Sequence, residues 1–181
     1  MAYKIVEPLA GLVQIGVVDT GYTYLNAAGA TITAPDAPMY VGMIVKGVDP
    51  VLGGGEFILL PGVAGTQIGS VVSYNTVTYT TALCVNTASL PVQLAIAMSA
   101  NTSATTWGWY QISGVAVVIK ATSDAGLVAG AAVGSSATAG YVTISGIGVE
   151  WEGAVCCVTP LVNAGTVQVM INRTVKQGRI T

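Results

Sequence analysis

The sequence predicts an all-β protein, either a small β-barrel or a β-sandwich of about ten short strands. Three observations support this prediction. Segments rich in Val, Ile, Thr and Tyr recur along the chain, separated by Gly, Pro, Asn and Ser, which are common in turns. In several segments, large apolar side chains alternate with small or polar ones, with a period of two residues. No segment keeps the 3.6-residue period of an amphipathic helix.

The expected strands follow one another from residue 40 onward. They cover residues 40–45, 56–60, 71–74, 76–81, 92–98, 107–112, 115–121, 141–145, 149–158 and 166–171. In 92–98 the even-numbered residues are large and apolar, and the odd-numbered ones are Gln or Ala, which predicts a half-buried strand. Residues 71–74 and 76–81 face each other across Asn75, which predicts a bend or a short hairpin.

The positions of the glycines predict where several turns between the strands lie. Ser113 and Gly114 are expected to join two strands, the second of which is apolar on both faces until Lys120 and is therefore predicted to be central. Residues 127–133 contain good helix formers, but the flanking glycines favour a surface turn. The glycines at 53–55 precede a strand, whereas a phosphate-binding loop follows a strand and opens a helix, so they are predicted to form a turn.

The two ends of the chain differ from its middle. Residues 1–38 are rich in Gly, Ala and Thr and are predicted to form an N-terminal arm or long loop, followed by a β-rich domain over 39–172. Residues 173–181 contain Arg173, Lys176 and Arg179, half of the six basic residues, and are predicted to form a basic C-terminal tail.

The composition of the 181 residues argues against several classes of function. Only 8% are charged, 52% are apolar, histidine is absent and the formal net charge is -2. A nucleic-acid-binding protein needs a basic surface to displace counterions, so nucleic acid is not an expected partner. Most acid–base catalysis at neutral pH uses histidine, so the chain is not expected to be an enzyme, and no cofactor is expected.

One pair of carboxylates leaves an enzyme hypothesis open. Glu150 and Glu152 would share one face of an extended strand, and two carboxylates can serve a glycosidase. A solvated strand edge is the simpler interpretation, so this hypothesis ranks below the others.

The mean hydropathy of +0.70 raises the question of a membrane span. No charged residue lies between Glu56 and Lys120, but prolines and polar residues interrupt that stretch, so a spanning helix is not expected. Glu7 and Pro8 closely follow Lys4, so a signal peptide is not expected either. The three cysteines suit buried thiols in a reduced compartment, and without histidine or a C-x-x-C spacing no metal or redox site is expected.

The aromatic segment 107–110 is the sharpest local feature. Trp107 and Trp109 are predicted to share one strand face, with Gly108 and Tyr110 on the other. Such a tryptophan face could stack on a sugar ring or lie at a subunit interface. Core packing or a subunit contact is favoured over a ligand platform, with Gly108 making room for a neighbouring backbone.

Nine short blocks scattered over most of the chain resemble a known family. They are residues 1–3, 5–8, 48–50, 55–58, 97–101, 108–114, 137–140, 171–173 and 177–181. The most specific are GWYQISG at 108–114 and the C-terminal ending, whereas residues 19–38 and the Leu60–Pro61 step depart from the family pattern. In these blocks the chain resembles the capsid decoration, or cement, proteins of tailed bacteriophages.

The resemblance implies a β-rich subunit that binds the outside of an expanded icosahedral shell and braces it against the pressure of packaged DNA. The implied partners are the major capsid protein and copies of the chain itself, with a trimer as the most common state. The implied location is the capsid surface of the virion, after synthesis in the host bacterial cytoplasm. Neither nucleic acid nor a membrane is an expected partner.

The residues and the resemblance together lead to three hypotheses. The first is a decoration protein whose candidate subunit or capsid contacts are Trp107, Trp109, Tyr110, Arg173, Lys176 and Arg179, with the basic tail lying on an acidic capsid surface. The second is a carbohydrate-binding module on the phage head or tail, which depends on an exposed Trp107 and Trp109 face. The third is the enzyme hypothesis described above.

Overall fold

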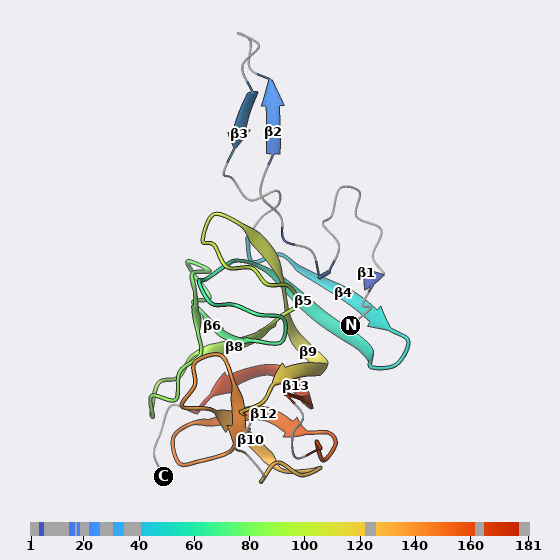
Figure 1. Cartoon of the computed structure of the whole chain (residues 1–181), viewed down its shortest axis with the longest axis vertical. Helices are drawn as coiled ribbons and strands as arrows, with labels where there is room; N and C mark the ends of the chain where they lie inside the picture. Colours follow the sequence, from blue (N-terminus) through green and yellow to red (C-terminus); the bar gives the residue numbers. More distant parts are fainter. Residues whose placement is uncertain are drawn as a thin grey trace.

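A computed structural model describes residues 4–5, 15–16, 18, 22–25, 31–34, 41–121, 126–161 and 165–177 (Figure 1). This part of the chain is all-β, as the sequence predicts. Over the described residues there is no helix of the length and hydropathy that a membrane span requires.

Strands account for most of the described chain. Their bounds are β1 Lys4–Ile5, β2 Tyr22–Leu25, β3 Thr31–Ala34, β4 Ile44–Asp49, β5 Gly53–Pro61, β6 Val71–Tyr74, β7 Thr81–Leu83, β8 Gln93–Ala97, β9 Trp107–Ile119, β10 Ala132–Ser135, β11 Val142–Ile144, β12 Glu150–Cys156 and β13 Thr166–Lys176.

The strands form one large sheet and one separate hairpin. The order along the large sheet is β1-β4-β5-β9-β8-β13-β12-β10-β11, β6 pairs with β8 and β7 pairs with β6, and β2 and β3 pair only with each other. The path has two ends, β1 and β11, so the predicted barrel is not formed, although a single parallel bridge joins Lys120 to Val142. The arrangement is closer to the predicted sandwich, because apolar clusters fill the space between layers.

β9 holds the two halves of the molecule together. Its first part pairs with β5, and its second part pairs with β13 (Figure 1). Gly114, where the two parts meet, has a φ of +96°, and a Cβ there would lie 2.3 Å from the carbonyl oxygen of Gly54. Only glycine fits this left-handed bend. The two strands predicted around Ser113 and Gly114 are therefore one bent strand.

The core extends over both faces of the central strands. In β5, Phe57 packs with Trp107 and Trp109 on one face, whereas Ile58 packs with Tyr110 on the other. A third cluster fills the lower half of the molecule as it is drawn in Figure 1, between β8, β9 and the strands from β10 to β13. β8 alternates as predicted, but both of its faces are buried, so the prediction of a half-buried strand is wrong.

Several predicted boundaries are wrong for reasons that lie in tertiary contacts. β4 begins at Ile44 rather than at residue 40, and β7 begins at Thr81, so residues 76–80 belong to the loop after β6. The glycines at 53–55 belong to β5 and not to a turn. A Cβ at Gly55 would lie 2.9 Å from the carbonyl oxygen of Ser113, so the glycine allows β5 and β9 to approach closely.

The two predicted ends also need correction. The predicted N-terminal arm includes β1, which pairs with β4, and the β2–β3 hairpin. Residues 15–16 and 18 are also described, and the rest of that segment lies outside the described residues. The predicted tail begins too early, because β13 continues through Lys176 and pairs with β12 there.

Candidate functional site

The aromatic segment of β9 lies in the core. Trp107 is 6% exposed, Trp109 1% and Tyr110 1%. The two indoles pack with Val45 and Phe57, so the exposed stacking face considered for a sugar is absent, and none of the three aromatic residues is accessible to a partner. The space left by Gly108 is taken by side chains rather than by a backbone, since a Cβ there would lie 2.9 Å from the Ser99 hydroxyl.

The phenol of Tyr110 is held among polar groups inside the core. Its hydroxyl donates to the carbonyl oxygen of Pro61 at 3.4 Å and lies 3.3 Å from the side-chain amide of Asn101. Burial raises the pKa of Tyr110 to about 12. These contacts give Tyr110 a structural role.

The three basic residues that were assigned to a tail have different environments. Lys176 is 1% exposed, and its ammonium group donates to the carbonyl oxygens of Val85 and Thr87, so it is a core residue rather than a surface contact. The Arg173 side chain is 59% exposed. Arg179 lies outside the described residues.

Arg173 forms an ion pair that joins β13 to β5 across β9. Its Nε and Nη2 atoms both donate to Oε2 of Glu56, each at 3.2 Å. Arg173 has a φ of +46°, uncommon for a residue other than glycine, at a point where β12 and β13 are out of regular register. This irregular backbone accompanies the change of β13 from pairing with β9 to pairing with β8.

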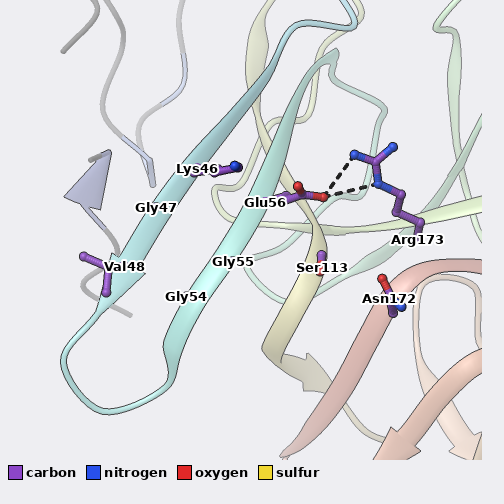
Figure 2. Close-up of a pocket in the computed structure, with 9 residues that line it drawn as sticks. All are labelled: Lys46, Gly47, Val48, Gly54, Gly55, Glu56, Ser113, Asn172 and Arg173. Carbon is purple, nitrogen blue, oxygen red and sulfur yellow. Dashed lines mark hydrogen bonds and ion pairs between the residues drawn. The ribbon is translucent and has the colours of Figure 1, made fainter. Parts of the chain in front are cut away.

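A shallow, open groove of about 590 Å³ surrounds this ion pair (Figure 2). Three of its lining residues are charged, and the glycines among the others leave parts of the β4–β5 wall without side chains. The lining residues are Lys46, Gly47, Val48, Gly54, Gly55, Glu56, Ser113, Asn172 and Arg173. The groove lies where β9 bends, beside the β4–β5 hairpin and β13.

Beyond the groove, the outward side of β9, β13, β12 and β10 carries a row of apolar side chains. Val115 pairs with Met170, Met170 with Val155, and Val155 with Ala132. Met170 is 42% exposed and Val155 37%. Val169 and Ile171 on either side of Met170, and Cys156 next to Val155, are buried, so this row faces away from the core.

The neighbouring rows on the same side are also uncharged. Ser113 pairs with Asn172 at the groove, and Val117 pairs with Gln168 on the far side of the apolar row. Past Val117 lies a second shallow hollow of about 290 Å³, which Leu161 helps to line. We call the three paired rows, from Ser113–Asn172 to Val117–Gln168, the outer face.

The remaining polar groups form no comparable site. Glu150 accepts a hydrogen bond from the Ser145 hydroxyl at 3.1 Å, and Glu152 is exposed. Burial raises the pKa of the Cys84 thiol, which lies 3.1 Å from the Ser135 hydroxyl. Over the residues that the structure describes, no three His, Cys, Asp or Glu side chains gather in a way that could hold a metal ion.

No protein-family model, curated protein or solved structure matches the chain. The surface of the described residues is therefore the basis for assigning a function. Sequence patterns did not single out Lys46, Glu56, Met170 or Val155 as site residues. The alternation in 166–171 could have marked Met170, since Val167, Val169 and Ile171 form the opposite face.

Proposed function

We propose that the chain is a structural virion protein that binds the outside of an icosahedral phage capsid and stabilises the shell. The implied partners are the major capsid protein and further copies of the chain. The observation that carries the proposal is the outer face, an uncharged surface with exposed apolar side chains on a rigid sheet. A surface of this kind is suited to binding another protein.

The physics of such binding favours a flat, preformed surface. Burying apolar surface contributes about 25 cal/mol per Å², and a stable interface covers about 800 Å² on each partner. The side chains of the outer face stand on paired strands, so little ordering entropy is lost on binding. If the chain binds the assembled shell but not the free capsid subunits, its binding stabilises the shell by mass action. A shell offers many equivalent positions for such binding.

The carbohydrate-binding alternative depended on an exposed Trp107 and Trp109 face. Both side chains are buried among core residues. No other observation favours that alternative, and the capsid-binding proposal does not depend on these residues.

The proposal is tested by co-sedimentation of the purified chain with expanded, undecorated shells of the phage that encodes it. We expect the wild type to sediment with the shells and the Met170→Glu/Val155→Glu double variant to stay in the supernatant. The control is Val77→Glu, which alters an 83% exposed apolar side chain in the loop between β6 and β7. Circular dichroism checks that each variant is folded. A wild type that fails to bind, or a double variant that binds as the wild type does, would refute the proposal.

A further inference from the structure

The exposed positive charges of the described chain gather in one place. Lys120 and Lys176 are buried, each 1% exposed. Lys46 and Arg173 are the exposed cations whose side chains the structure describes, and both line the groove. The chain carries a net charge of -2, so the groove gathers positive charge on a protein whose net charge is negative.

The charges inside the groove do not balance. Glu56 is the one carboxylate among its described lining residues, and Oε2 of Glu56 already accepts from Arg173. Lys46 stands opposite Glu56 in the β4–β5 register but makes no ion pair with any described residue. Figure 2 shows Lys46 and Arg173 on opposite sides of Glu56. Among the lining residues that the structure describes, the groove therefore holds two cations against one anion, an excess of one positive charge.

Arg173 is prepared for a further contact. A guanidinium group has five N–H donors on three nitrogens. Nε and Nη2 are used by Glu56, and Nη1 makes no hydrogen bond to a described residue. The ion pair orients the guanidinium, so less side-chain entropy would be lost when an anion binds to its free edge.

The wall beside these cations allows a close approach. The β4–β5 hairpin contributes Gly47, Gly54 and Gly55 to the groove, and a Cβ at Gly54 would meet nothing within 4 Å. A partner loop could therefore approach the backbone at Gly54 closely, where Lys46 and Val48 are the side chains that β4 contributes to the groove. Because Ser113 and Asn172 belong to both the groove and the outer face, one partner could cover both.

We propose that the groove receives an acidic loop of the major capsid protein, with a carboxylate paired with Lys46 on one side of Glu56 and a further acceptor of the loop at the free edge of Arg173 on the other side. This inference rests on the proposed function and identifies the chemistry of the partner segment. The carboxylate supplies the negative charge that the groove lacks, and the apolar row next to the groove supplies the remaining contact area. Charged contacts at an interface edge direct encounter and orientation, and they weaken as salt rises.

The test measures the affinity of fluorescently labelled chain for undecorated shells at 50 and 500 mM NaCl. We expect Lys46→Glu to weaken binding at least tenfold at 50 mM NaCl, and Arg173→Glu to do the same. The affinity of Lys46→Glu should also change less with salt than that of the wild type. The matched control is the Val77→Glu/Ile147→Glu double variant, which changes the net charge by the same amount at two exposed residues that do not line the groove, and it should bind as the wild type does.

The outcomes separate this inference from the proposed function. If the wild type does not bind shells, both are overturned. If the wild type binds but Lys46→Glu and Arg173→Glu bind equally well, the groove inference fails and the proposed function stands. If the Val77→Glu/Ile147→Glu double variant weakens binding as much as Lys46→Glu does, the loss reflects net charge alone and the groove inference fails. If sedimentation without shells shows that Lys46→Glu changes only self-association, the groove receives a second copy of the chain, so the groove inference fails and the proposed function stands.

Discussion

The ammonium group of Lys176 donates a hydrogen bond to the carbonyl oxygen of Val85 at 2.6 Å, although the two residues are 91 positions apart in the chain. The same group also donates to the carbonyl oxygen of Thr87. These bonds fasten the loop after β7 to the end of β13. The sequence suggested that the charge of Lys176 would face a partner. Instead, this side chain joins two distant segments inside the molecule.

Replacement of this lysine should destabilise the fold. Lys176→Met keeps most of the side-chain volume but leaves the two carbonyl oxygens without their donor, so the free energy of unfolding should fall by about 1–3 kcal/mol. Urea denaturation of the two proteins measures the difference. The control is Lys46→Met, which removes an exposed ammonium group and should change stability by less than about 0.5 kcal/mol. Equal stability of both variants would show that the Lys176 bonds contribute nothing.

The tryptophans of β9 should behave as core residues. Trp109 is 1% exposed and packs with Phe57, so Trp109→Ala should lower the free energy of unfolding by about 3–5 kcal/mol. Denaturant unfolding checks this, with Trp109→Phe as a milder variant that keeps an aromatic ring. A Trp109→Ala variant as stable as the wild type would contradict the buried position and reopen the ligand-platform interpretation.

The bend of β9 should depend on one glycine. Gly114→Ala forces a Cβ into a left-handed backbone conformation and against the carbonyl oxygen of Gly54, so it should destabilise the chain by more than about 1 kcal/mol. Gly54→Ala is the matched control on the facing strand, because its added Cβ meets nothing within 4 Å. Thermal unfolding should separate the two variants clearly. If both melt together, the bend does not require glycine.

Tyr110 should make stability fall at high pH. Its pKa is raised from 10.0 to about 12 in the folded chain, so the folded state retains its proton over a range in which the unfolded state loses it. The stabilising contribution is complete below pH 10 and is lost as the pH rises through about 12. The melting temperature should drop over this interval, and it should drop less steeply for Tyr110→Phe. Identical slopes would show that another group causes the loss.

The sequence predicted those strands whose bounds are marked by turn residues and by alternation within the segment itself. β6 was predicted with its observed bounds, and β8 within one residue at each end, because turn residues and alternation are visible within each segment. The burial of both faces of β8 could not be predicted, since it depends on strands that lie elsewhere in the sequence. The glycines at 53–55 were misassigned for the same reason, because Gly55 pairs with Gly114.

The candidate site was harder to predict than the fold. Lys46 and Arg173 are separated by most of the chain, and only the pairing of β4 with β5, β5 with β9 and β9 with β13 brings them to one groove. Formal charge suggested that Lys176 would be exposed, but two backbone carbonyl oxygens accept its hydrogen bonds inside the fold. The aromatic pattern left core packing and a subunit contact open together, and only the pairing of β9 with other strands shows that Trp107, Trp109 and Tyr110 are buried.

The most direct test of the capsid assignment is immunogold labelling of purified virions with antibodies against this chain. We predict uniform label over the heads, as expected for a protein bound to many equivalent positions on the outer shell. Label confined to the tails, or no label on intact particles, would contradict the assignment to the capsid surface.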